Sequence, residues 1–512
     1  MFSIVYSGGI RGMEAYPVRV EVDIARGLPG FELVGSAGSD VKEARERVQI
    51  ALKNAGILLP VSKIIVNLSP AHIRKEGTGY DLPIAAGLLA CMEIMNADDF
   101  QDTAFLGELA LSGEIRRVNG VLPIALSLMK EGIRRFLVPI DNMGECAGVA
   151  GITLIGIKNI KELLYYLQAS EEERAGAFQT SHDLDKTTKS MELSQGFTQI
   201  YGQESAKRAA EVAAAGFHHL MIAGPPGTGK TMIARHIPDI LPPFTDKERQ
   251  EVSSVYSIAG KLDGSNAYID KRPFIAPHHT ISPQALAGGG RIPRPGLLSL
   301  AHRGVLFLDE MPEFSSKVLE VLRQPMEEKK VHIARSLGTY TYPADFILIC
   351  ALNPCPCGFY PDRNRCNCTE PDIRRYLNRI SGPILDRIDI VTEATPIKVE
   401  DFHQNNKKEA DDGVRERVLQ ARKRQWLRYQ GSSYHFNGEL PGKEVNRYCI
   451  LHSAEQRFLE KVFEAEQMSV RSYHKVIKLA RTIADLEDED RIQISHLSEA
   501  VCYNTGKQRF WN

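Results

Sequence analysis

The sequence predicts an α/β protein of three domains, the last of them helical, and three observations lead to this fold class. Strand and helix signals alternate over residues 1–168 and again over residues 197–395, whereas helical patterns dominate residues 396–512. A length of 512 residues is enough for three domains with separate cores. The polar segment 169–196 lies between the first two domains and is predicted to be a flexible linker.

The composition is that of an ordinary globular protein, with 43% hydrophobic and 25% charged residues. Because the net charge is only -1, any contact with nucleic acid must come from local basic patches. The apolar runs are too short to span a membrane, and the first residues lack the pattern of a signal peptide. Nine cysteines, four of them clustered, favour a reducing cytoplasm and a local metal site over a disulfide framework.

The secondary structure of the first domain is predicted from the spacing of its apolar residues. Val41, Ala44, Val48 and Leu52 recur at helical spacing, and Gly56 is placed to end that helix. Other apolar segments predict strands at 63–68 and 135–139 and a buried helix at 82–91.

The stretches 74–83 and 107–116 resemble parts of the proteolytic domain of Lon proteases. In that family the nucleophilic Ser and its partner Lys occupy positions that fall here near Gly79 and Leu122, and residues 74–83 contain no Ser. Neither Gly nor Leu can act as a nucleophile or a base. The resemblance therefore implies a Lon-like fold that serves as a scaffold or interaction surface, with an active protease as the alternative.

The second domain contains a phosphate-binding loop, in which four residues separate two glycines and Lys-Thr follows. An apolar strand is predicted before it at 219–223 and a helix after it at 231–237, so the helix N-terminus would face the phosphates of ATP. The alternative is a Gly/Pro-rich turn that binds nothing. The residues of the loop are Gly224, Pro225, Pro226, Gly227, Thr228, Gly229, Lys230 and Thr231.

Two further strands of this domain end in polar residues suited to ATP hydrolysis. The segment 304–310 has an apolar run followed by two carboxylates. Asp309 would hold Mg²⁺ together with Thr231, and Glu310 would polarise the attacking water as general base. Asn353 follows the next predicted strand and is placed to orient that water.

Long, specific strings at 275–282 and 301–310 resemble the magnesium-chelatase-like AAA+ ATPases of the YifB/ComM family, and the likeness runs over nearly the whole chain. One departure is Leu297, where the family usually has an acidic residue. The resemblance implies that Asn353 is the first sensor, that Arg387 is an arginine finger inserted into a neighbouring subunit, and that Arg471 is the second sensor, reaching the γ-phosphate from the lid. The alternative for Arg387 is an ion pair with Asp386 or Asp389 of its own subunit.

Two inserts are predicted to project toward the pore of a ring and to contact DNA. One surrounds the triple glycine at 288–290, and the other is a hairpin spanning residues 328–342. Basic side chains near Tyr340 and Tyr342 suit phosphate contact with base stacking, and the alternative is a solvated hairpin. The candidate DNA contacts are Lys329, Lys330, Arg335, Arg291 and Arg294.

Four cysteines form two C-x-C pairs separated by eight residues. Four thiolates suit tetrahedral Zn²⁺, which would have a structural role here. The alternatives are an iron–sulfur cluster and unligated thiols. The residues are Cys355, Cys357, Cys366 and Cys368.

The C-terminal domain contains two charged segments. The predicted helix 414–428 has a basic face that is either solvated or in contact with DNA, and the acidic run 487–490 is predicted to be a solvated turn.

Together these features predict an ATP- and Mg²⁺-dependent hexameric motor acting on single-stranded, forked or branched DNA. A branch-migration helicase of recombination or natural transformation is the specific hypothesis. One alternative is a chelatase-type ATPase that drives metal insertion into a tetrapyrrole, against which the Lon-like domain and the four cysteines argue. The other is a protein-remodelling ATPase.

Overall fold

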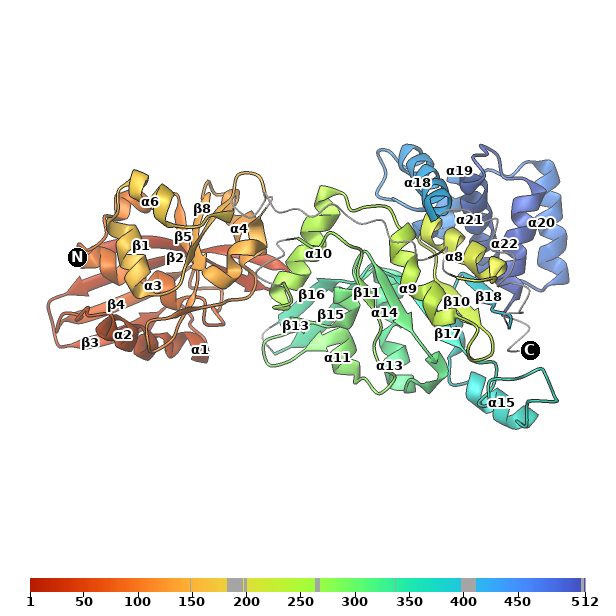
Figure 1. Cartoon of the computed structure of the whole chain (residues 1–512), viewed down its shortest axis with the longest axis horizontal. Coiled ribbons are helices and arrows are strands. Elements are labelled where there is room, and N and C mark those ends of the chain that lie inside the picture. Colours follow the sequence, from red (N-terminus) through yellow and green to blue (C-terminus); the bar gives the residue numbers. More distant parts are fainter. Residues whose placement is uncertain are drawn as a thin grey trace.

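The computed structural model describes residues 1–147, 149–181, 197, 200–262, 268–336, 338–396, 411–507 and 511. Three bodies lie in a row (Figure 1): an N-terminal sheet with its helices, a central parallel sheet, and a C-terminal group of helices. The polypeptide is therefore an α/β protein with a helical C-terminal region, as predicted.

The N-terminal body is built on a seven-stranded sheet of order β3-β4-β2-β1-β5-β8-β9. The antiparallel pairs are β1 with β2 and β2 with β4, and the remaining pairs are parallel. The strands are β1 Phe2–Arg11, β2 Glu14–Ala25, β3 Gly30–Val34, β4 Lys63–Ser69, β5 Thr103–Phe105, β8 Arg135–Pro139 and β9 Thr153–Ile157, beside a small hairpin of β6 Glu108–Leu109 and β7 Ile115–Arg116. The helices are α1 Ser39–Lys42, α2 Ala44–Asn54, α3 Asp81–Cys91, α4 Val121–Met129 and α5 Ile160–Gln168.

The helix predicted from Val41, Ala44, Val48 and Leu52 is present, divided at Glu43 into α1 and α2. All four apolar side chains are fully buried in the apolar core of the N-terminal body, so the helical spacing identified the buried face of these helices. The predicted strands at 63–68 and 135–139 and the helix at 82–91 are confirmed as β4, β8 and α3.

The start of the predicted linker is helical. Residues Glu171–Ala177 form α6, and the Ser170 hydroxyl accepts a hydrogen bond from the backbone N–H of Glu173 while the Glu173 carboxylate accepts from the Ser170 backbone. The polar composition led to the prediction of a flexible segment here. The helix was missed because a capping box stabilises a helix start without apolar residues. Most of the remaining predicted linker, residues 182–196, lies outside the described residues.

The central body is a five-stranded sheet of order β11-β14-β17-β10-β18, in which all neighbouring strands are parallel. Its strands are β10 Leu220–Ala223, β11 Phe274–Ile275, β14 Val305–Leu308, β17 Ile347–Leu352 and β18 Ile390–Glu393. The larger helices are α8 Glu204–Gly216, α9 Lys230–Ile240 and α10 Asp246–Ile258. The strands β10, β14 and β17 are fully buried, as expected for a parallel sheet with both faces covered.

Short elements fill the connections of the central body. The glycine insert contains α11 Pro283–Ala287, β12 Gly288–Gly289, β13 Arg294–Pro295 and α12 Leu297–Leu300. Beyond β14 follow α13 Ser316–Val321, α14 Arg323–Glu328, the hairpin of β15 Lys330–Arg335 and β16 Gly338–Pro343, α15 Glu370–Leu377 and α16 Gly382–Leu385. Leu297, the departure noted in the sequence, begins α12 and packs against the apolar cluster that contains Leu298.

The C-terminal body consists of α18 Asp411–Arg428, α19 Gly442–Tyr448, α20 Ser453–Ala465, α21 Val470–Leu486 and α22 Ile494–Thr505. Helices α18 and α21 pack on α8, so the lid and the sheet share one apolar core. Among the described residues, no helix has the length and apolar character needed to cross a bilayer.

Candidate nucleotide site

The phosphate-binding loop connects β10 to α9, as predicted. Gly227 and Gly229 have φ angles of +81° and +85°, a left-handed conformation that a side chain would strain. Gly224 is required for a different reason, because a Cβ there would lie 2.4 Å from the carbonyl oxygen of Ala394. The loop therefore depends on glycine at each of these three positions.

Lys230 begins α9 and is almost completely buried. Its ammonium donates to the carbonyl oxygens of Gly224 (2.7 Å) and Pro225 (2.8 Å) and to the side-chain oxygen of Asn353 (3.2 Å). Burial lowers the pKa of Lys230 to about 8, and the nearby carboxylates of Asp309 and Glu310 oppose this shift. The loop thus holds a partly desolvated cation bonded only to neutral oxygens, which phosphate oxygens could replace.

The predicted acidic residues lie beside the loop. The Thr231 hydroxyl donates to Asp309 Oδ2 at 2.9 Å, although the two residues are separated by 78 positions in the chain. Oxygen donors of this kind fit Mg²⁺. Glu310 is exposed and has a left-handed backbone with φ +50°. Because β17 lies between β10 and β14, Asn353 is placed between the loop and the two carboxylates.

The two predicted arginines lie at the opposite edge of the sheet. Strands β10 and β18 are parallel with Leu220 opposite Ile390, so Arg387, just before β18, shares the amino edge. The phosphate loop follows β10 at the carboxyl edge. On helix α21, Lys475 donates to the Ile388 carbonyl oxygen at 2.8 Å, which fixes the start of that helix at the amino edge too.

Both arginines contact the same carboxylate. Arg387 and Arg471 each form an ion pair with Glu327 of α14, the latter at 3.0 Å. The structure therefore pairs Arg387 with neither Asp386 nor Asp389, and it does not bring Arg471 to the phosphate loop of its own chain.

Sequence reasoning missed Glu327 and Lys475. Glu327 stands in an ordinary charged stretch, and no local pattern distinguishes it from its neighbour Glu328. Lys475 is one helical turn beyond Arg471, and its burial becomes visible only once the packing of α21 is known.

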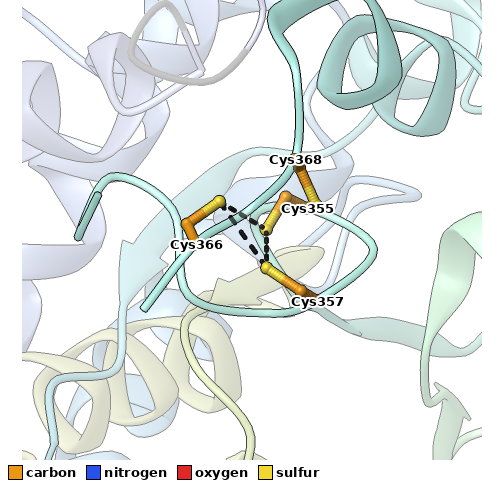
Figure 2. A group of neighbouring side chains, drawn as sticks. All are labelled: Cys355, Cys357, Cys366 and Cys368. Atoms are coloured by element: carbon orange, nitrogen blue, oxygen red, sulfur yellow. Dashed lines mark hydrogen bonds between the residues drawn. The ribbon is translucent and has the colours of Figure 1, made fainter. Parts of the chain in front are cut away.

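The four cysteines converge in the loop before α15 (Figure 2). All four sulfur atoms lie within 4.8 Å of one another, and the separations among Cys355, Cys357 and Cys366 are 3.3, 3.7 and 3.6 Å. Four sulfurs at about 2.3 Å from one Zn²⁺ would be separated by about 3.8 Å. The arrangement therefore fits a tetrahedral metal centre.

Backbone N–H groups surround these sulfurs. The amide of Tyr360 donates to Cys355 Sγ at 3.4 Å. A hydrogen bond from the backbone at Phe359 lowers the pKa of the Cys357 thiol to about 6. Donors to sulfur favour the thiolate form that binds metal.

The candidate DNA contacts fall into two groups. Lys329 forms ion pairs with Asp345 and Glu439, and Arg291 forms one with Asp40 of the N-terminal body. In the part of the chain that the structure describes, no carboxylate pairs with the remaining three. These are Lys330, Arg294 and Arg335.

The tyrosines of the hairpin are not available for base stacking. Tyr342 is fully buried and donates to the Pro293 carbonyl oxygen at 2.6 Å, and Tyr340 is 7% exposed. They lie opposite Val331 and Ile333 on the apolar face of the hairpin. The prediction of tyrosine stacking is therefore wrong for this conformation, and the tyrosines instead join the hairpin to the glycine insert.

The N-terminal body has Gly79 and Leu122 at the positions that the resemblance assigns to the nucleophile and the base of a Lon protease. Gly79 lines a cavity of about 660 Å³ between this body and the inserts, and Leu122 is buried. The hydroxyl of Thr78, which precedes Gly79 in the chain, donates to Glu108.

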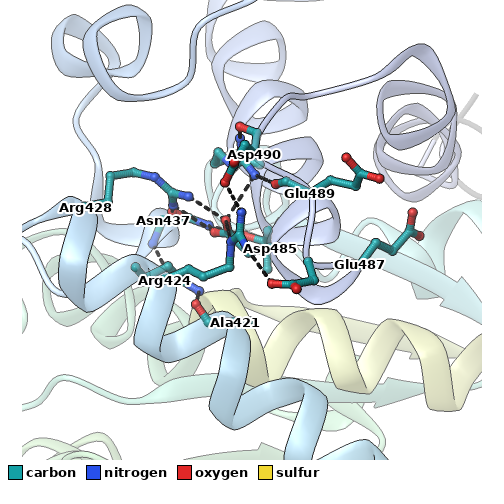
Figure 3. Close-up of polar contacts among 12 residues, drawn as sticks. Ala421, Arg424, Arg428, Asn437, Asp485, Glu487, Glu489 and Asp490 are labelled. Carbon is teal, nitrogen blue, oxygen red and sulfur yellow. Dashed lines mark hydrogen bonds and ion pairs between the residues drawn. The ribbon is translucent and has the colours of Figure 1, made fainter.

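Two arginines near the end of α18, Arg424 and Arg428, form ion pairs within the C-terminal body (Figure 3). Arg428 forms a bidentate pair with the buried Asp485, and Arg424 pairs with Asp488 and Asp490. The acidic run 487–490 is an exposed turn, as predicted, and two of its carboxylates also form exposed ion pairs with Arg424 of α18.

Three family profiles match the chain. The profile described as magnesium chelatase, subunit ChlI, matches residues 196–402, and that of its C-terminal part matches residues 408–504. A profile described as subunit ChlI of Mg-chelatase matches residues 20–142.

Two relatives are similar over their whole length. A protein called YifB in Salmonella typhimurium is 40% identical over 503 residues, covering 98% of this chain and 96% of that protein. Competence protein ComM of Haemophilus influenzae is 41% identical over 514 residues, covering 98% and 97%. Lon protease 2 of Bacillus subtilis is 31% identical over 147 residues, 27% of this chain and 26% of that protease.

Proposed function

Because the chain belongs to the YifB/ComM family of magnesium-chelatase-like AAA+ ATPases, we propose that it is a hexameric motor that moves on DNA. Its substrates would be single-stranded, forked or branched DNA, and its activity would be branch migration in recombination or natural transformation. The observation that supports a ring is the location of the hydrolytic residues and the arginines at opposite edges of one sheet.

The hydrolytic residues have separate roles in this proposal. Lys230 would bind the β- and γ-phosphates of ATP, and Thr231 and Asp309 would hold Mg²⁺, which offsets phosphate charge when bound. Glu310 is exposed beside the loop and would take a proton from the attacking water. Asn353, now bonded to Lys230, would orient that water.

Arg387 and Arg471 would act on the ATP of the neighbouring subunit. Neither can serve its own phosphate loop, since the length of strands β10 and β18 separates them from it. A guanidinium at the γ-phosphate stabilises the charge that develops in phosphoryl transfer. This placement changes the expectation for Arg471 from a residue acting within its own chain to one acting in trans.

Lys330, Arg335 and Arg294 would contact DNA phosphates. Arg335 donates to the Gly290 carbonyl oxygen at 3.3 Å, so the hairpin and the glycine insert form one basic surface. The relative from Haemophilus influenzae is named as a competence protein, which supports a substrate of this class. We also propose that Cys355, Cys357, Cys366 and Cys368 hold a structural Zn²⁺ and that the protein works in the cytoplasm.

The test is ATP turnover with and without forked or four-way-junction DNA, with strand displacement measured in the same reaction. DNA-stimulated turnover with displacement is expected, and Lys230→Ala should abolish both. The double variant Lys330→Ala/Arg335→Ala should lose the DNA stimulation and keep basal turnover, whereas Lys317→Ala, on the exposed face of α13, should resemble the wild type. ATP turnover that no DNA substrate stimulates would exclude the proposal that the protein is a motor acting on DNA.

A chelatase-type ATPase is the second candidate, because the matching profiles are those of a magnesium-chelatase subunit. The N-terminal body does not argue against it, since a profile of the same description matches residues 20–142. The DNA motor is favoured because the similarity to YifB and ComM extends over 98% of the chain.

A further inference from the structure

Arg387 and Arg471 are joined by one carboxylate, that of Glu327, which the sequence patterns do not single out. Arg387 comes from the turn before β18, Arg471 from α21 and Glu327 from α14, three elements far apart in the chain. The two arginines bond to the same oxygen, Oε1, of Glu327. We propose that Glu327 is the positioning residue that brings both guanidiniums to one point on the subunit surface, so that they address the same ATP of the neighbouring subunit.

The contacts show why this role requires a carboxylate. Two guanidiniums that converge without an anion between them repel each other. Arg387 is held further by a 2.6 Å hydrogen bond from Nη1 to the Pro383 carbonyl oxygen, and its side chain is only 10% exposed. Arg471 has Glu327 as its counter-ion and is 48% exposed. Without Glu327, the exposed Arg471 would be the first to leave the position beside Arg387.

Glu327 also lies at the base of the candidate DNA hairpin. Lys330, the first residue of β15, is three positions further along the chain, and Lys329 between them pairs with Asp345 and Glu439. A movement of the hairpin on DNA would therefore move the carboxylate that holds both arginines. In this way, contact with DNA in one subunit would alter hydrolysis in its neighbour.

The adjacent glutamate provides a matched control. Glu328 faces a different set of partners, since it lies 3.3 Å from the His332 ring and accepts a 2.9 Å hydrogen bond from Gln324. In the part of the chain that the structure describes, Glu328 contacts neither Arg387 nor Arg471. A substitution of Glu328 changes the charge of the same helix end and leaves the two arginine pairs intact.

The inference rests on the proposed trans action of the arginines, and the first measurement is steady-state ATP turnover with DNA. Glu327→Gln should lower kcat at least tenfold, an effect of about the size seen when one transition-state contact is lost. The KM for ATP should stay within about twofold, because ATP is bound by the loop of the other subunit. Glu327→Asp should recover part of the loss, and Glu328→Gln should behave as the wild type. Wild-type or faster turnover by Glu327→Gln would overturn the proposal.

The second measurement mixes two inactive variants. Glu310→Gln lacks the general base and keeps both arginines, whereas Glu327→Gln keeps the base. In a mixed ring, a Glu327→Gln chain beside a Glu310→Gln chain has a complete site, so turnover should return. Absence of recovery would overturn the role of Glu327, provided that Arg387→Ala mixed with Glu310→Gln recovers. If that control pair also stays inactive while the wild type hydrolyses ATP, the trans role of the arginines fails as well.

Discussion

Burial of Lys230 in the fold changes the pKa of its ammonium group. In the folded chain its pKa is about 8, below the ordinary value of 10.5, because burial disfavours the charged form. The folded state therefore binds fewer protons than the unfolded state between pH 8 and 10.5. It follows that this residue opposes folding at neutral pH and that its contribution to stability improves as the pH rises through this window.

We predict that ATP binding is coupled to proton uptake at Lys230. At pH 8 about half of the free protein carries a neutral Lys230, and phosphate oxygens favour the charged form. Binding should therefore take up about half a proton, measured by calorimetry in two buffers of different ionisation enthalpy. Lys230→Arg should show almost no uptake, because arginine stays charged. Equal uptake by both proteins would assign the proton to another group.

Single residues were predictable from the sequence where their function depends on local spacing. Gly227, Lys230 and Thr231 are fixed by a short pattern, and the structure places them as one loop. Glu327 was not predictable, because its partners Arg387 and Arg471 lie 60 and 144 positions away. Only the folded arrangement shows that this one carboxylate is shared.

At the scale of elements, the loop before α15 is expected to depend on a bound Zn²⁺ for its ordered conformation. We predict about one Zn²⁺ per chain by elemental analysis, and its loss in Cys355→Ser, because Cys355 is the fully buried member of the four. The loop of the variant should become sensitive to limited proteolysis, which reports order in this segment. Cys502→Ser changes an exposed cysteine outside the cluster and should keep the metal. A wild-type chain without metal would contradict the prediction.

The lid depends on one buried charge between its helices. Asp485 is fully buried and is contacted by Arg428, Arg481 and Asn437 (Figure 3). Asp485→Asn would leave two guanidiniums without their main counter-ion and should lower the free energy of unfolding of the lid by about 3 kcal/mol. Thermal or urea unfolding, followed by the fluorescence of Trp426 in α18, would measure the change.

Asp488 offers the comparison for this prediction. It also pairs with an arginine of α18, Arg424, but its side chain is 74% exposed. Asp488→Asn should therefore have a much smaller effect than Asp485→Asn, since exposed ion pairs contribute little. Similar losses from both variants would show that burial of Asp485 is not what stabilises the lid.

The hairpin shows what strand periodicity could have added to the sequence analysis. Tyr340 and Tyr342 are two residues apart and therefore share a face, and across the hairpin they lie opposite Ile333 and Val331. Alternation thus places them with the apolar side of the hairpin. The charges of α18 could not be assigned in the same way, because their partners in 485–490 follow from helix packing and not from local pattern.

At the scale of the whole molecule, the N-terminal body is attached to the central body through α10. The Ser257 hydroxyl donates to the buried Glu145 carboxylate at 2.5 Å, the Gly120 N–H donates to the Ser257 carbonyl oxygen at 3.1 Å, and Arg117 donates to the Leu262 carbonyl oxygen. These contacts lie beside α4, which packs against α10.

We predict that Ser257→Asp separates the two bodies. A second carboxylate would face Glu145 in a buried position, where like charges repel strongly. Small-angle X-ray scattering should show a larger radius of gyration for the variant. Ser257→Ala removes one hydrogen bond without adding charge and should scatter like the wild type. Unchanged scattering from Ser257→Asp would mean that other contacts determine the arrangement.

The order of the strands in the central sheet could not be predicted from the sequence, which predicted β10, β14 and β17 but neither β11 nor β18. Apolar runs at 219–223, 304–308 and 346–351 identify β10, β14 and β17, but periodicity does not say which strands are neighbours. That order has functional meaning, because it places Asn353 between the phosphate loop and the acidic residues.

The separation of the hydrolytic residues and the two arginines between the edges of one sheet also gives the protein a direction. Each chain would accept the neighbour's arginines at the edge with its phosphate loop and would contribute its own arginines from the other edge. The contact between copies would therefore be head-to-tail and not two-fold symmetric. Under the proposed trans action of Arg387 and Arg471, an isolated chain would be catalytically incomplete. Specific activity should consequently increase with protein concentration until the assembly closes and then reach a plateau.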